Sequence, residues 1–192
     1  MSNVLFALWM SLSVGLVLLF FYAAYLNWRN HRTNNVDLGE ILPSFLPVDV
    51  EALAALIGPA EEELLRQEHS REEFVQIQRQ RARLTIDALR RMTRNAALLQ
   101  KLGYSELHSP NDLICSLAQE MIEAGVYVRL YSFVGLVKIH LRGWLTFGRP
   151  LFEPPDILSS SLIPAYEQLK DKAGNLTCLK FSSLHEALIQ SL

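Results

Sequence analysis

The residues that most often carry chemistry, histidines above all, are scattered along this chain. Its five histidines lie at positions 31, 69, 108, 140 and 185. None has a glutamate three residues before it, which removes the Glu-x-x-His pair of di-iron helical bundles. The sequence also lacks the His-Glu-x-x-His zinc pattern, the Gly-x-Ser-x-Gly turn and the glycine-rich loops that bind phosphates. We therefore predict no catalytic residue, no metal site and no cofactor.

Weaker candidates for chemistry are still present. A site assembled from residues far apart in sequence would use His108, Glu120 and His140, near the central helices. The acidic group Glu61, Glu62, Glu63 and Glu68 with His69 could bind a metal, but a solvated helix start explains it better. Residues 159–161 are three serines without a neighbouring base, so we interpret them as loop or cap residues. The two cysteines are isolated and are expected to be reduced, buried thiols.

The longest helix that the sequence predicts sorts its charges onto one side. It runs from about residue 71 to residue 102, opened by a capping box of Ser70 and Glu73 and ended by Gly103. Wrapped at ~100° per residue, one narrow stripe collects five basic side chains. This basic stripe consists of Arg79, Arg83, Arg90, Arg94 and Lys101. Apolar residues lie opposite without a clean heptad, which favours a helix packed in a bundle over a long coiled coil.

The basic stripe has two interpretations. In the first, the stripe binds a polyanion: the anionic membrane leaflet, an acidic segment of a partner or, with least support, nucleic acid. In the second, it is simply a helix face that water solvates. Residues 49–73 hold eight acids against two arginines, so neighbouring helices of opposite sign could also pair within the chain or between copies. Arg81 lies on the apolar side, where we expect it to reach outward to solvent or else to meet a buried carboxylate.

The segment from Val4 to Leu26 contains neither charge nor proline. A helix of that length covers ~34 Å, which matches the hydrocarbon core of a bilayer. Aromatic residues and then Arg29 and Arg32 follow, so we predict a retained membrane anchor with its amino terminus outside and the rest of the chain cytoplasmic. Within it, small residues repeat every four positions, at Ala7, Ser11 and Gly15. This repeat is either a face on which another helix docks or a chance arrangement.

We predict a mainly α protein in three parts. Residues 1–28 form the transmembrane anchor, residues 29–48 a juxtamembrane linker, and residues 49–192 a cytoplasmic domain resembling a helical bundle. Within that domain Asp49 caps a helix at 50–57, Ser109 with Pro110 opens one that Gly125 ends, and Gly174 ends a later helix, before a short extended segment at 176–181.

Residues 126–147 allow more than one interpretation. Part of this segment alternates like a strand, but over the longer window its apolar residues have helical spacing, which favours a helix. A second membrane span is the alternative, and it would have to carry Arg129, Lys138 and Arg142. The sequence alone leaves open whether this segment lies on the membrane or in the domain core.

Taken together, these features favour a single-pass membrane-anchored interaction or scaffold protein, such as an accessory subunit of a larger membrane complex. A protein partner or a second copy is expected. The formal net charge of −2 creates no global field that would attract nucleic acid. Two alternatives remain: a membrane-tethered enzyme with a non-contiguous site, and a module that binds anionic lipid or nucleic acid through the basic stripe.

Overall fold

Long helices dominate the part of the chain that the structure describes. The computed structural model describes residues 41–58, 65, 67–145 and 154–180. Its elements are the 3-10 turn η1 (Leu42–Ser44), α3 (Val50–Ile57), α5 (Arg71–Glu106), α6 (Asp112–Leu145), the π turn η2 (Leu158–Leu162) and α7 (Ile163–Lys180). These described ranges contain no strand, which confirms the prediction of a mainly α, bundle-like fold.

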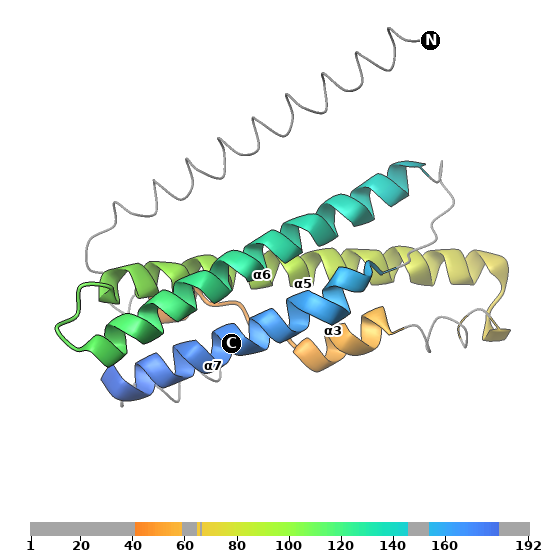
Figure 1. The fold of residues 1–192 in the computed structure, drawn as a ribbon. Coiled ribbons are helices and arrows are strands. Elements are labelled where there is room, and N and C mark those ends of the chain that lie inside the picture. The colour runs from red at the N-terminus through yellow and green to blue at the C-terminus, as the bar shows by residue number, and fades with distance from the viewer. Residues whose placement is uncertain (1–40, 59–64, 66, 146–153, 181–192) are drawn as a thin grey trace, which may run out of the picture. The chain divides into compact units, whose positions relative to one another are not determined.

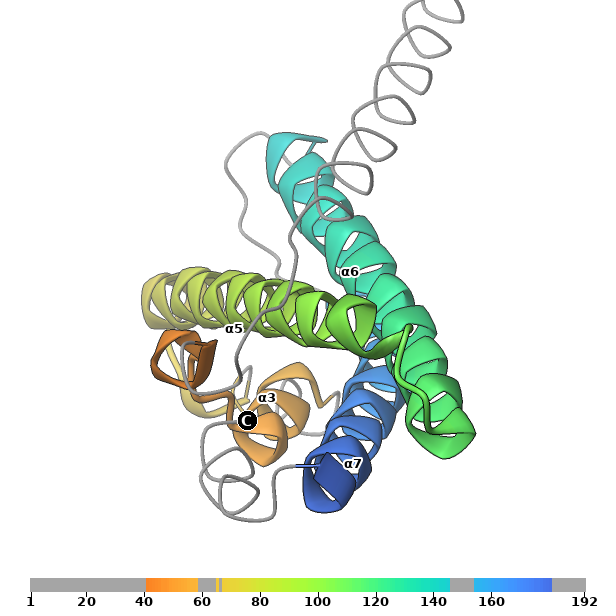
Figure 2. The same cartoon turned by 90° about the vertical axis from the view of Figure 1, so that its left-hand side faces the viewer.

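Three helices pack around a common core, and the short α3 lies against α5 (Figures 1 and 2). Helix α6 packs on both α5 and α7, and both views show it diverging from α5 toward its carboxyl end. The largest side chains in this core are completely buried: Leu89, Met92, Leu99, Met121, Leu158, Tyr166 and Leu169. Removal of this apolar surface from water is the main force that holds the helices together.

The predicted helix starts are largely confirmed. The Asp49 carboxylate accepts a hydrogen bond from the Ala52 N–H at 2.8 Å, and α3 spans the predicted residues. Ser70 and Glu73 form the predicted capping box. The Ser70 hydroxyl and the Ser70 N–H both donate hydrogen bonds to the Glu73 carboxylate, and these bonds, the hydroxyl's most of all, lower the pKa of Glu73. Helix α6 starts later than predicted, because Asn111 accepts from the Leu113 N–H at 3.0 Å.

Two glycines that were predicted to end helices lie inside them. Helix α5 continues through Gly103 to Glu106, and α6 continues through Gly125 to Leu145. A Cβ on Gly103 would lie 2.8 Å from Ile122 Cγ1, and a Cβ on Gly125 would lie 2.5 Å from the Gln100 side chain. The predicted stops are therefore wrong, because these glycines allow close packing of α5 and α6 rather than a left-handed cap.

Helix α7 (Ile163–Lys180) is also longer than predicted. Helix α7 passes Gly174 and reaches Lys180, so the predicted extended segment is helical at 176–180. Leu176 and Thr177 are buried along α7, and this tertiary burial outweighs the local preference for a break. Cys178 on this helix was expected to be buried, but it is exposed.

The serines at 159–161 lie in the turn before α7. The hydroxyls of Ser159 and Ser160 both donate a hydrogen bond to the Asp156 carbonyl.

Parts of the predicted linker at 29–48 and of the segment at 126–147 lie within the described residues. Ile41 and Phe45, from the predicted linker, are buried in the core, and residues 126–145 belong to α6, which confirms a helix there. None of the helices in the described ranges combines the length and the apolar character that a membrane crossing requires. The predicted anchor at 4–26, with Ala7, Ser11 and Gly15, lies outside the described residues.

Candidate functional site

The basic stripe lies on the outer side of α5, away from the core. Arg79, Arg83, Arg90 and Arg94 are exposed, and Lys101 is half-buried. On the opposite side Met92 and Leu99 are completely buried, as the predicted sorting of this helix requires. Leu84 departs from that pattern, because helical periodicity puts it among the apolar residues opposite the stripe, but its side chain is 49% exposed.

The charges of the basic stripe are largely free of local compensation. Arg90 pairs with Asp87 at 3.6 Å, but both side chains are mostly exposed, and such pairs contribute at most about 1 kcal/mol. Arg79, Arg83 and Arg94 have no ion-pair partner within the described ranges. The described acids Asp49 and Glu73 cap their own helices instead of reaching the stripe. The arginines therefore remain available to an anionic group from outside this part of the chain.

Arg81 takes a role that the sequence interpretation did not predict. It is only 5% exposed, and its Nε and Nη2 donate to the Leu56 carbonyl at 3.1 and 2.5 Å. That carbonyl lies in the last turn of α3, where helical partners are missing. Both predicted outcomes are wrong for the described residues, since Arg81 neither reaches solvent nor meets a carboxylate. Its charge instead fixes α3 against α5.

Arg81 belongs to a polar line that enters the core. Gln78, Arg81 and Thr85 are spaced so that they share one side of α5, and all three side chains are buried. Both amide atoms of Gln78, Nη1 of Arg81 and the Thr85 hydroxyl have no hydrogen-bond partner in the described part of the chain. Buried polar atoms of this kind each cost about 1–3 kcal/mol. Within the described residues, this end of the bundle therefore has more buried polar atoms without a hydrogen-bond partner than the rest of the core.

A second buried polar group joins three elements near the middle of α5. The Asn95 side chain accepts from the Leu46 N–H at 3.0 Å and donates to the Leu46 carbonyl at 2.7 Å. It also donates to the Tyr166 hydroxyl on α7 at 3.0 Å. Burial raises the pKa of Tyr166 to about 12, and the hydrogen bond from Asn95 only partly opposes that effect. Asn95 thus holds residues 45–47 and α7 to the same helix.

The raised pKa of Tyr166 predicts a loss of stability in alkali. Above pH 10 the unfolded chain releases the phenol proton while the folded protein retains it, so rising pH favours unfolding until the folded pKa near 12 is passed. The slope should approach about 1.4 kcal/mol per pH unit. Unfolding measured between pH 9 and pH 11 should show a steeper loss for the wild-type protein than for Tyr166→Phe. Equal slopes would contradict the prediction.

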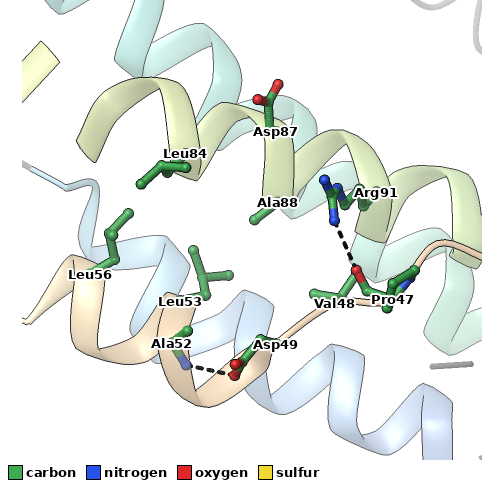
Figure 3. Close-up of a pocket in the computed structure, with 10 residues that line it drawn as sticks. All are labelled: Pro47, Val48, Asp49, Ala52, Leu53, Leu56, Leu84, Asp87, Ala88 and Arg91. Carbon is green, nitrogen blue, oxygen red and sulfur yellow. Dashed lines mark hydrogen bonds between the residues drawn. The ribbon is translucent and has the colours of Figure 1, made fainter. Parts of the chain in front are cut away.

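A hollow of about 240 Å³ lies between α3 and α5 (Figure 3). Its wall consists of Pro47, Val48, Asp49, Ala52, Leu53, Leu56, Leu84, Asp87, Ala88 and Arg91. Arg91 donates to the Pro47 carbonyl at 3.2 Å, and Asp49 is occupied with capping α3, as the dashed lines show. Most of the wall is apolar, and it contains no histidine, cysteine or serine. The hollow suits an apolar side chain rather than a reaction.

The scattered candidates for an enzyme site are not brought together. Glu120 forms an ion pair with Lys172, and His140 is exposed, with its Nδ1 at 2.7 Å from the Leu136 carbonyl. Because Glu120 and His140 are twenty residues apart on the same helix, about 30 Å separates them along its axis. His108 is exposed beyond the end of α5, and none of the three lines the hollow.

Metal ligands are not gathered within the described ranges either, which hold no cluster of three or more histidine, cysteine or carboxylate side chains. Glu61, Glu62 and Glu63 lie outside these ranges. Sequence patterns alone do not assign a role to Asn95, although an asparagine on the apolar side of a helix is a signal that could have pointed to one. Comparison of the chain with known protein families, with curated proteins and with solved structures finds no match.

Proposed function

We propose that this protein is a single-pass membrane-anchored interaction protein whose α5 presents the basic stripe to an acidic segment of a partner. The observation that carries the proposal is the exposure of Arg79, Arg83 and Arg94 along one side of a 36-residue helix. Because the other side of α5 is packed in the core, the backbone positions that carry these arginines are fixed relative to one another. A fixed row of arginines is suited to charge-assisted hydrogen bonds with carboxylates.

The length of the row sets the size of the partner segment. Arg79 and Arg94 are fifteen residues apart, which places them about 22 Å apart along the helix axis. An extended chain rises about 3.3 Å per residue, so about seven residues of an acidic segment would span the row. Contacts of this kind raise the association rate and make binding sensitive to salt.

The anchor half of the proposal is supported by the uncharged run at 4–26 and the arginines that follow it. A tether to the membrane would confine α5 near membrane partners and raise their effective concentration. We expect the full-length protein to stay with membranes after carbonate washing. Release into the supernatant would contradict the anchor but would leave the proposal for the basic stripe to be tested separately.

The basic stripe is tested with a defined probe, a short fluorescent polyglutamate peptide, and the full-length protein in mild detergent. Arg83→Gln with Arg94→Gln should weaken binding by about five-fold and flatten its salt dependence, since two exposed charge pairs are lost. The matched control is Arg71→Gln with Lys170→Gln, which removes the same charge from positions outside the stripe. An equal loss in both variants, or no loss in either, would contradict docking on α5.

A further inference from the structure

A row of apolar side chains is exposed along the outer side of α6. It consists of Val126, Leu130, Phe133, Val137 and Leu141, which are between 41% and 53% exposed. Their spacing of four, three, four and four residues places them in one line on the helix. We refer to these five residues as the apolar stripe. Single exposed leucines are ordinary, but a contiguous apolar row on a protein surface marks a contact.

The apolar stripe is not a misassigned part of the core. The opposite side of α6 is the buried one: Val128 and Ser132 are 0% exposed, and Gly135 faces Leu158 across the helix contact. The stripe therefore faces away from α5 and α7. It extends over sixteen residues, about 22 Å along the axis, in the half of α6 that diverges from α5 (Figures 1 and 2).

The charges around the apolar stripe have one sign. Residues 124–152 contain no aspartate or glutamate, whereas the first half of α6 carries Asp112, Glu120 and Glu123. At ~100° per residue, Arg129 and Lys138 lie on the two opposite borders of the stripe. Lys138 is exposed, and Arg129 donates to the Gln100 amide oxygen at 2.8 Å. An occupant of this surface must accept apolar side chains in the middle and positive charge at both edges.

An anionic bilayer surface has that combination. Apolar side chains enter the boundary between headgroups and acyl chains, while the exposed Lys138 at one edge reaches the phosphates and Arg129, held by Gln100, adds positive charge at the other. A second copy of this chain fits less well, because stacking stripe on stripe sets basic borders against basic borders, and the nearest acids of α6, Glu120 and Glu123, lie beyond the amino-terminal end of the stripe. A crossing of the membrane does not fit, because the buried side of α6 is held by the bundle.

We propose that the apolar stripe of α6 lies in the surface of an anionic membrane, with the rest of the bundle above it. This contact goes beyond the proposed docking on α5, because it uses a different helix and a different occupant. It also does not require residues 4–26 to cross the bilayer. The lipid is recognised by its negative headgroup rather than by any further chemistry.

The test uses the full-length protein reconstituted into vesicles, with Cys115 and Cys178 changed to serine. Single cysteines replace Leu130, Phe133 or Val137 and carry spin labels, whose collisions with oxygen and with an aqueous nickel chelate are measured. In phosphatidylcholine vesicles containing phosphatidylserine, we expect several-fold more access for oxygen relative to nickel at these sites. In phosphatidylcholine alone that ratio should fall toward the value for water.

Two control positions separate membrane insertion from mere closeness to the bilayer. Leu179 on α7 is 52% exposed, which matches the 51% of Leu130, and Gln119 continues the line of the stripe into the acidic half of α6. Labels at both controls should stay accessible to nickel. Nickel access at the stripe would overturn the proposal. Exclusion of both oxygen and nickel would overturn it too, because it would mean that protein, such as a second copy, covers the stripe.

The spin-label results for the apolar stripe can be distinguished from a failure of the predicted membrane anchor. All substitutions are at exposed or half-buried positions, so the bundle should keep its helical circular dichroism. If carbonate releases the protein but the stripe labels still contact lipid at neutral pH, the anchor is wrong and the α6 contact holds. If the protein resists carbonate while the stripe labels remain in water, the opposite conclusion follows.

Discussion

Replacing Asn95 with alanine should lower the free energy of unfolding by about 3 kcal/mol. The side chain makes hydrogen bonds to the N–H and carbonyl of Leu46 and to the Tyr166 hydroxyl, and the last of these is buried. Alanine would remove all three of these hydrogen bonds, and a polar group that loses its bond in a buried or partly buried place costs more than a formed bond contributes. Denaturant unfolding followed by circular dichroism, in mild detergent, measures the change.

Two further variants show whether the network or the general loss of a polar residue causes the effect. Tyr166→Phe removes the hydrogen bond with Asn95 but keeps the Leu46 bonds, and it should cost about 1 kcal/mol. Thr93→Ala, on the same helix, removes a hydroxyl that donates to the Leu89 carbonyl at 2.8 Å within α5, so it should cost less than Asn95→Ala. Combining Asn95→Ala with Tyr166→Phe should cost less than the sum of the two. Strict additivity would mean that Asn95 and Tyr166 act separately.

The parts of the fold that could be predicted from the sequence are those that depend on near neighbours. The Asp49 cap and the Ser70–Glu73 box each involve residues three positions apart, and both are confirmed. The sorting of α5 into a basic and an apolar side follows from helical periodicity alone. Each of these features can be read without knowing what packs against the helix.

The rest depends on contacts between residues far apart in the chain. Arg81 finds the Leu56 carbonyl 25 positions away, and Asn95 finds Tyr166 71 positions away, so no local pattern names either partner. The same holds for the outer side of α6. Its helical spacing was recognised, but which side of the helix the core would cover depends on where α5 and α7 lie. The stripe that carries the lipid proposal became visible only once that side was known.

Gly103 shows how the same residue supports two interpretations, and replacing it with valine should lower the free energy of unfolding by about 3 kcal/mol. A Cβ at this position would lie 2.8 Å from Ile122 Cγ1 and 3.1 Å from the Ala118 carbonyl oxygen, which belongs to the backbone of α6 and cannot rotate away. The two helices would have to separate, and core contacts on both sides of Gly103 would loosen. Thermal unfolding followed by circular dichroism should show a clear fall in midpoint.

The alanine variant separates close packing from the other roles of a helical glycine. In an uncrowded helix interior, Gly103→Ala should raise stability by up to about 1 kcal/mol, because alanine has the higher helix propensity. The contact with α6 predicts a loss instead. Gly125→Ala should also cost stability, since its Cβ would lie 2.5 Å from the Gln100 side chain, which is buried and hydrogen-bonded to Arg129 and to the Ile122 carbonyl. Adding Ile122→Ala should recover part of the loss at Gly103, because it removes the nearest atom. A gain in stability from Gly103→Ala alone would mean that α5 and α6 do not approach each other so closely.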